Sequence, residues 1–300
     1  MIYPTIITIV LTLSSSLAFG QKLKFKHIKF EDYQEQYYIN RSSKQKDGSY
    51  IKFRSMPSGI NVIESGQFKD GIRDGTWYFF YFRNSLKSEG IYKNRMKVGI
   101  WKTYFFNQSP SLNGNTLIAN GDSISISVQA QNKNLKSIGN FDRGIKTGIW
   151  SYYDKHSDLV HQFDHSSGKL LSRDSSKLNL NRTPIYLGGN ESLIESIKME
   201  LLPLEVIGMR RNIEFLSIEI SLVIGKSGDT QDILINKSSG FQDADRAFIQ
   251  SINSIDNNWI PALEEGEGRK EEVIIRLNYK REKITESGFQ SSFQIEVENN

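Results

Sequence analysis

The chain has 300 residues, no cysteine and a formal net charge of +4, with acidic and basic residues interspersed along most of its length. The absence of cysteine excludes disulfides, thiolate catalysis, thiolate metal ligation and a lipid-modified cysteine, and the modest mixed charge gives no sign of a nucleic-acid-binding surface. The 13 Tyr, 17 Phe and 23 Gly favour many short strands joined by tight turns.

Residues 1–20 have the pattern of an export signal. The stretch 2–13 is largely apolar, and Ala18 and Gly20 are placed like a small-residue cleavage site before Gln21. The apolar stretch is shorter than the ~20 residues that span a bilayer. Lysines follow it and none precedes it, which is the reverse of the usual signal-peptide bias. We expect cleavage after Gly20 and a soluble mature chain.

A local concentration of positive charge follows this segment, at Lys22, Lys24, Lys26 and Lys29. Such a run is most often the solvated face of a strand, and contact with an anionic surface is the alternative. The spacing by itself leaves both interpretations open.

Three segments further along match one another. Each carries a glycine, an aromatic residue two positions later, a second glycine and then a Trp. A half unit precedes them at 48–50, and the longer interval before the third segment predicts a diverged unit within 107–138, where Ile124, Ile126 and Val128 alternate. The shared glycines and tryptophans are Gly66, Gly75 and Trp77; Gly90, Gly99 and Trp101; and Gly139, Gly148 and Trp150.

Each segment is predicted to be a β-hairpin whose aromatic side chains stack on those of its neighbours, since one hairpin cannot bury a core alone. For the three Trp, packing between hairpins is favoured over a face that stacks on a ligand. Residues 45–170 resemble MORN-type repeats, in the variant found in exported bacterial repeat proteins. The resemblance implies a binding or scaffolding platform without activity of its own.

The clearest group of histidines and acids lies just after the third repeat. His161 and His165 flank Phe163, with Asp158 and Asp164 nearby, and strand alternation puts both histidines on one face. Metal binding needs converging ligands with oriented partners. Exposed polar strand residues are therefore the favoured interpretation, a metal site is the alternative, and no metal or cofactor is expected.

The sequence changes character after a polar linker at 171–182. Asn190 is a candidate helix cap, apolar residues then recur on one helical face, and Pro203 ends that helix nearby. Residues 216–224 alternate as a half-buried strand, and a second apolar run follows at 233–235.

A second helix is predicted from Asp243, and a last clear strand alternates over 273–279. The order β-α-β-β-α-β predicts one antiparallel sheet covered on one side by two helices. The expected fold class is therefore a β-hairpin repeat region followed by an α+β domain.

Several sequence pieces stand in register with these elements. They are Gly188 and Gly189 before the first helix, Gly228 after the first long strand, and Trp259, Pro261 and Ala262 before the last strand. With them, residues 183–280 resemble the carboxy-terminal domain of TonB, the energy-transducing protein of Gram-negative envelopes. We interpret Trp259 and Pro261 as fold determinants rather than contact residues.

The resemblance implies that this domain binds an extended segment of an outer-membrane transporter by strand addition. The strand that it implies as the docking edge comprises Glu272, Val273, Ile274, Ile275, Arg276, Leu277, Asn278 and Tyr279. An ordinary edge strand blunted by Arg276 and Lys280 is the alternative. Phe293, Ile295 and Val297 also alternate in the polar tail, and a strand there would cover this edge and block strand addition.

The predicted organisation is a signal peptide at 1–20, repeats at 21–170, a linker at 171–182, a TonB-like domain at 183–280 and a tail at 281–300. We expect a periplasmic interaction or adaptor protein of a Gram-negative bacterium that contacts envelope proteins, such as transporter segments, and meets the membrane only through them. The alternative is a TonB-type energy transducer. It would need a retained anchor and normally a Pro-rich spacer, which six scattered Pro do not provide.

An enzyme is not expected. The chain has four His and no Cys, and it carries no glycine-rich phosphate loop, nucleophile elbow or HExxH helix. The acidic cluster of Glu264, Glu265 and Glu267 follows Pro261 and is predicted to be a solvated turn.

Overall fold

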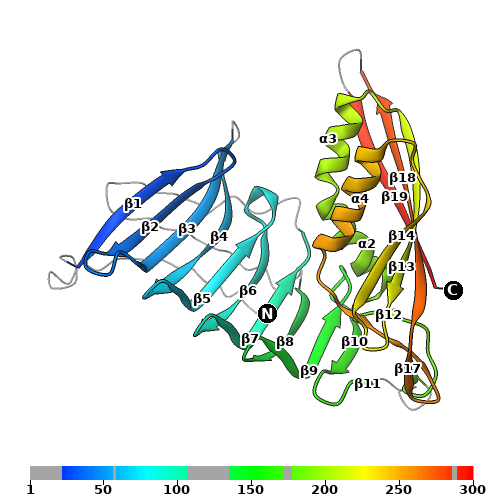
Figure 1. Ribbon diagram of the computed structural model, residues 1–300, viewed down its shortest axis with the longest axis horizontal. Helices are drawn as coiled ribbons and strands as arrows, with labels where there is room; N and C mark the ends of the chain where they lie inside the picture. The colour runs from blue at the N-terminus through cyan, green and yellow to red at the C-terminus, as the bar shows by residue number, and fades with distance from the viewer. Residues whose placement is uncertain (1–21, 57–58, 107–134, 172–177, 286–288, 300) are drawn as a thin grey trace, which may run out of the picture. The chain divides into compact units, whose positions relative to one another are not determined.

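The computed structural model describes residues 22–56, 59–106, 135–171, 178–285 and 289–299. The predicted signal segment and the alternating stretch around Ile124, Ile126 and Val128 lie outside these residues. The chain divides into two compact units (Figure 1). The first unit ends at Ser157 and includes His165–Ser167, and the second consists of Asp158–Asp164 and Gly168–Asn300.

The first unit is a row of antiparallel strands in which each described strand is hydrogen-bonded to the next one in the chain. The hairpins β4–β5, β6–β7 and β8–β9 contain the three sequence repeats. The strands are β1 (Leu23–Lys29), β2 (Gln34–Asn40), β3 (Lys46–Met56), β4 (Gly59–Lys69), β5 (Ile72–Phe80), β6 (Leu86–Lys93), β7 (Met96–Tyr104), β8 (Leu135–Asp142) and β9 (Ile145–Tyr153), with a 3-10 helix, η1 (Phe82–Asn84), between β5 and β6.

Each repeat hairpin contains a β-bulge opposite its first glycine. The cross-strand register shifts at Gly66, at Gly90 and at Gly139, because the second strand of each hairpin has two more residues there than the first strand. A bulge bends its strand and increases the local twist. The sequence repeat is therefore also a repeat of the backbone irregularity.

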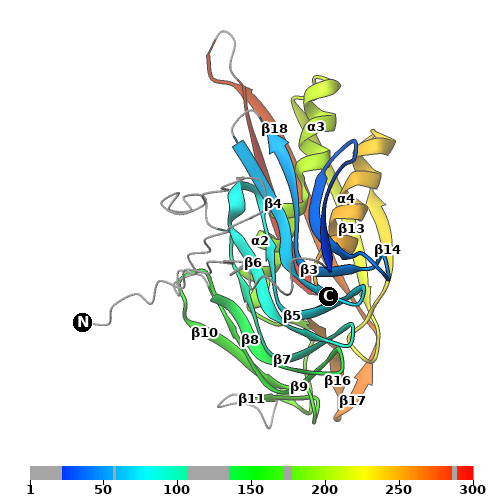
Figure 2. The ribbon, with the colours of Figure 1, turned by 90° about the vertical axis from the view of Figure 1, so that its left-hand side faces the viewer.

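The second unit combines a four-stranded antiparallel sheet, in the order β14-β13-β18-β19, with helices on one face, as Figures 1 and 2 show for α3 and α4. Its main elements are α2 (Gly189–Glu200), α3 (Leu202–Arg210), β13 (Phe215–Ile224), β14 (Thr230–Lys237), α4 (Gln242–Ser254), β18 (Glu271–Lys283) and β19 (Phe289–Asn299). Short strands complete it: β10 (Leu159–Asp164), β11 (Lys169–Leu171), β12 (Ile185–Tyr186), β15 (Trp259–Ile260), β16 (Ala262–Glu264) and β17 (Glu267–Arg269).

The core of the second unit lies between this sheet and its helices. Alternate residues of β18, from Val273 to Tyr279, are 0% exposed and pack against Leu193 of α2 and Phe248 of α4 within one cluster. One buried face per strand is what the two-residue alternation of the sequence predicts. The antiparallel, β-rich fold class is thus confirmed.

The β10–β11 hairpin comes last in the strand order that begins with β1, and its contacts group most of it with the second unit. Asn179 caps the outer side of β11 with its side-chain amide. Its Oδ1 accepts from Leu170 N at 3.1 Å, and its Nδ2 donates to Leu170 O at 2.9 Å. A side chain that imitates a neighbouring strand in this way blunts an edge.

Three expectations for the helical part are corrected. The first strand, β12, pairs with β15 in a separate two-stranded sheet and is no member of the main sheet. Gly188 is the N-cap of α2, with a left-handed φ of 96°, so Asn190 lies inside the helix. A third helix, α3, begins at Leu202, because Pro203 has the fixed φ and missing N–H that a first helical turn accepts.

The expected docking edge is corrected as well. Within the described residues β18 pairs with β13 on one side and with β19 on the other. The strand Glu272–Tyr279 is therefore interior to the sheet. The alternating tail, residues 293–297, forms the strand that covers it, and both hydrogen-bonding sides of β18 are used.

Candidate interaction surfaces

A continuous row of rings runs through the first unit, here called the aromatic row. Its members, in order, are Tyr50, Phe68, Trp77, Tyr92, Trp101, Phe141, Trp150 and His165. Neighbouring centroids are 5.1 to 6.0 Å apart and the planes meet at 75° to 90°, the edge-to-face arrangement that aromatic quadrupoles favour. The three indoles are at most 1% exposed and offer no ring face to a ligand.

The first glycine of each repeat leaves space for the Trp of the same hairpin. A Cβ added at Gly66, Gly90 or Gly139 would lie 2.4, 2.2 or 2.1 Å from the nearest indole atom. Each indole N–H then donates to the backbone carbonyl one residue beyond that glycine, at 3.1 to 3.2 Å. The Trp ring of each repeat thus lies against the backbone of the first glycine, which explains the fixed spacing between these two residues.

The second glycine of each repeat allows a backbone conformation with a positive φ. A Cβ at Gly99 would meet no atom within 4 Å, but its φ of 65° is one that side-chain-bearing residues rarely adopt. Gly75 and Gly148 have the same property, with φ of 70° and 61°.

In each repeat, the basic residue two positions before the second glycine lies over the ring of the Trp. Lys46 lies over Tyr50 in the same way, two positions before Gly48 of the half unit. These covering cations are not part of the pattern recognised in the sequence, although basic-x-Gly-x-Trp or Tyr is visible there at a fixed offset. The cation-to-centroid distances are 4.5 Å for Lys46 over Tyr50, 4.2 Å for Arg73 over Trp77, 4.4 Å for Lys97 over Trp101 and 4.7 Å for Lys146 over Trp150. Contacts of this kind contribute about 0.5–2 kcal/mol each.

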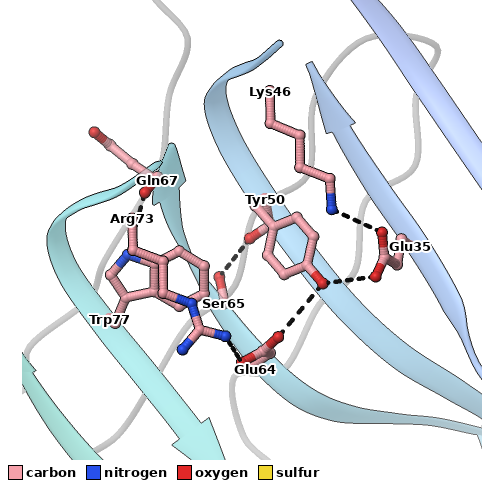
Figure 3. Close-up of polar contacts among 8 residues, drawn as sticks. All are labelled: Glu35, Lys46, Tyr50, Glu64, Ser65, Gln67, Arg73 and Trp77. Carbon is pink, nitrogen blue, oxygen red and sulfur yellow. Dashed lines mark hydrogen bonds and ion pairs between the residues drawn. The ribbon is translucent and has the colours of Figure 1, made fainter. Parts of the chain in front are cut away.

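Two carboxylates join the first two covering cations to Tyr50 (Figure 3). The Tyr50 hydroxyl lies 3.0 Å from a Glu35 oxygen and 3.4 Å from a Glu64 oxygen, and it donates its one hydrogen to this pair. Lys46 pairs with Glu35 at 2.9 Å and Arg73 with Glu64 at 2.6 Å. Two negative and two positive charges are thus balanced around one phenol, and the arrangement is that of a packed polar cluster.

Two buried tyrosines of the first unit, Tyr50 and Tyr104, are held in their neutral form. Burial and then the charges of Glu64 and Glu35 raise the pKa of Tyr50. Burial and then Glu89, which accepts from its hydroxyl at 2.7 Å, raise the pKa of Tyr104. These shifts move the phenols further from neutral pH, so they give no acid, base or nucleophile there.

The aromatic row ends at His165, which occupies the ring position of a next repeat. Its ring lies edge-on to Trp150, its backbone N–H donates to Gly148 O at 2.9 Å, and its Nε2 lies 2.8 Å from the Tyr152 hydroxyl. The sequence pattern predicts no packing role for this residue. Its signal would have been its position beyond Trp150, where an aromatic residue follows in the other repeats.

His161 has a different task. Its Nδ1 accepts a hydrogen bond of 3.1 Å from the backbone N–H of Gly188, beside Gly189 at the start of α2. Burial lowers the pKa of His161, which favours the neutral ring that this bond requires. Among the described residues no group of three or more His, Asp or Glu is placed to hold a metal ion.

Three of the residues on which the resemblance rests, Gly228, Trp259 and Pro261, meet at the β13–β14 turn. Gly228 has a φ of 85°, and a Cβ there would lie 2.6 Å from the backbone oxygen of Trp259. The Trp259 side chain is 6% exposed and Ala262 is 0% exposed. The Pro261 carbonyl accepts from Arg182 Nε at 2.9 Å. These residues fix the path of the chain between α4 and β16.

The interior position of β18 leaves its side chains committed to the fold. Arg276, on the face away from the helices, donates to Glu219 and to Glu298 at 2.7 Å each and so links three neighbouring strands. Cross-strand charge pairs of this kind stabilise a sheet modestly. They do not leave a surface for an added strand.

The outer strand β14 has an unpaired side in the described sheet. Leu234 is 50% exposed and Ile235 is 43% exposed. Register with β13 is regular over Asp232–Ile235 and slips at both ends of that stretch. The strand contains no Pro, and its two charges, Asp232 and Lys237, flank the apolar centre.

No protein-family model, curated protein or solved structure matches this chain. The described residues include no helix long and apolar enough to cross a membrane. Glu264, Glu265 and Glu267 surround the exposed β16–β17 turn, where Glu265 has a φ of 51°. Of the surfaces described here, the open side of β14 is the one that offers both backbone hydrogen-bonding groups and apolar side chains.

Proposed function

We propose that the protein is an exported interaction or adaptor protein of the Gram-negative envelope, without catalytic activity, whose second unit is a TonB-like domain that binds an extended segment of a partner. The open side of β14 carries this proposal. An unpaired edge presents a row of N–H and C=O groups that template another strand. Leu234 and Ile235 add apolar contacts beside that row.

The residues that carry the TonB resemblance support the same proposal, with β14 as the docking strand in place of the strand Glu272–Tyr279. Gly228, Trp259 and Pro261 meet at the turn that leads into β14. The family resemblance implies strand addition along the strand Glu272–Tyr279, where β19 already lies. The docking edge proposed for the envelope partner is therefore β14, the outer strand at the other end of the sheet.

The first unit is proposed to be a MORN-like scaffold. Its repeated glycines, rings and covering cations are used in packing the hairpins against one another. Selectivity for partners then belongs to residues outside the repeat pattern. Outer-membrane transporter segments and other envelope proteins are the proposed partners, and no nucleic acid is.

A photoreactive amino acid placed at Asp232 in the full chain, in the bacterium that makes it, tests the docking edge. Asp232 is exposed on β14, and Gln250 is an exposed control position on α4. We expect an adduct with an envelope protein from position 232 and none from position 250. Adducts from position 250 alone, or none from either position, would refute the proposed docking.

Export is tested by the mass of the mature chain. A chain that begins at Gln21 supports the exported adaptor. An intact Met1 in the membrane fraction contradicts it and favours the energy-transducer alternative.

A further inference from the structure

Two other strands lie at the ends of their sheets. Within the described residues β1 pairs with β2 alone, and β19 pairs with β18 alone. β19 keeps an unbroken register over its 11 residues. An edge of this length with a regular register is suited to accept a further strand.

The two edges carry opposite charge. Along β1, Lys24 and Lys26 alternate with Phe25, and along β19, Glu296 and Glu298 alternate with Val297. Lys24, Glu296 and Glu298 are exposed, and Lys26 is half-buried. Glu298 already pairs with Arg276, and its side chain still remains 57% exposed.

The alternation makes one antiparallel register complementary on both faces. When Lys24 stands opposite Glu298, Lys26 stands opposite Glu296, and Phe25 stands opposite Val297 between them. Directly opposite residues on neighbouring strands point to the same face, so both charge pairs form on one face and the apolar pair on the other. No like charges oppose one another in this register.

We propose that β1 of one copy of this chain pairs antiparallel with β19 of a second copy. A second β1 is a poor partner for β1, because pairing centred on Phe25 places Lys24 opposite Lys26. The interface is heterologous, since two different edges meet, and such contacts extend head to tail unless a ring closes. This assembly goes beyond the proposed function and leaves β14 open.

Charge reversal tests the pairing. In analytical ultracentrifugation we expect the wild-type chain to form species larger than a monomer as its concentration rises. The double variant K24E/K26E and the double variant E296K/E298K should each remain monomeric. Their equimolar mixture should associate again, because β1 of the first then faces β19 of the second with the charges exchanged.

Unchanged far-ultraviolet circular dichroism and melting temperature show that each variant folds. A wild-type chain that stays monomeric throughout the concentration range overturns the proposal. Association by both double variants alone overturns it as well.

Disulfide trapping tests the register, because the natural chain has no cysteine. Ile28 and Gln294 are exposed and stand opposite each other in the proposed pairing. A chain with Ile28→Cys, mixed with a longer tagged chain with Gln294→Cys, should give a mixed disulfide under mild oxidation. Gln290→Cys is the control, four residues away and about 13 Å along the strand. Equal trapping at positions 290 and 294 contradicts the register.

Discussion

Gly90 illustrates how one missing side chain sets the geometry of a whole repeat. The indole of Trp101 occupies the space that a Cβ would take, with 2.2 Å between them. We predict that Gly90→Ala lowers the free energy of unfolding by at least about 3 kcal/mol, because the ring must leave its place in a packed row. Urea unfolding followed by Trp fluorescence measures this loss.

Gly99 in the same hairpin is the matched control. A Cβ there meets no atom within 4 Å, so Gly99→Ala costs only the strain of a left-handed φ, about 1 kcal/mol. Equal losses at positions 90 and 99 would contradict the separate roles given to the two glycines.

His161 makes the second unit sensitive to acid. Burial lowers its pKa in the folded chain, so the unfolded chain takes up a proton first as the pH falls below about 6.5. The free energy of unfolding should therefore decrease from about pH 7 to about pH 5. His161→Asn keeps an acceptor for the Gly188 N–H and does not titrate, so this variant should lose part of that decrease. An unchanged pH dependence in urea titrations would refute the assignment.

Tyr78 makes the stability of the protein sensitive to high pH. Burial, with the nearby Glu89, raises its pKa to about 12 in the folded protein. Below the ordinary tyrosine pKa of about 10 both states keep the proton, and above it the unfolded chain ionises first, so stability is lost as the pH rises further. Tyr78→Phe should reduce the loss between about pH 10 and about pH 11. The same loss in the variant and in the wild-type chain would contradict this.

At the scale of elements, Asp245 joins the end of β14 to α4. It is 6% exposed and accepts from the hydroxyls of Ser238 and Ser239 and from the backbone N–H of Ser239. Burial opposes its charge, and the hydrogen bonds outweigh that effect and hold its pKa below the ordinary value. We predict that Asp245→Ala costs about 2 kcal/mol of stability at neutral pH, measured by urea unfolding.

Asp243, two residues earlier, provides the comparison. Its pair with Arg211 at 2.7 Å is exposed to solvent, which screens the two charges, so Asp243→Ala should cost less stability than Asp245→Ala. A larger loss for Asp243→Ala than for Asp245→Ala would contradict the account of this connection.

Strands were predictable from the sequence where one face is buried, because the two-residue alternation over 216–224 and 273–279 records that burial directly. The helix α3 was not predictable in this way. Pro203 indicates the end of one helix, but it is equally acceptable in the first turn of the next. The sequence is compatible with a helix end and with a helix start at Pro203. The packing of the apolar residues after Pro203 decides for the helix start.

The open edge was harder to predict than the strands themselves. Whether β18 is interior depends on a strand that begins several residues later, and the alternation at 293–297 is visible without saying where it pairs. The covering cations were missed for a different reason. The glycines and rings define the repeat pattern, and Lys97 or Lys146 gains its meaning only from the ring beneath it.

At the scale of the whole molecule, the two units use different means of building a sheet. In the first unit, aromatic rings of successive hairpins pack against one another. In the second unit, one face of the sheet is buried under α2, α3 and α4. Repeating hairpins lengthen a surface without changing its core. A chain that contains both a repeat surface and an open strand edge fits the proposed adaptor, which would hold partners together.

Amide hydrogen exchange of the full chain, with and without a detergent-solubilised envelope fraction, tests the central claim most directly. Strand addition hydrogen-bonds the outward-facing amides of β14, so we predict slower exchange over Thr230–Lys237 and unchanged exchange over α4. Unchanged exchange over β14, with protection elsewhere in the second unit or nowhere in the chain, would contradict docking at this edge.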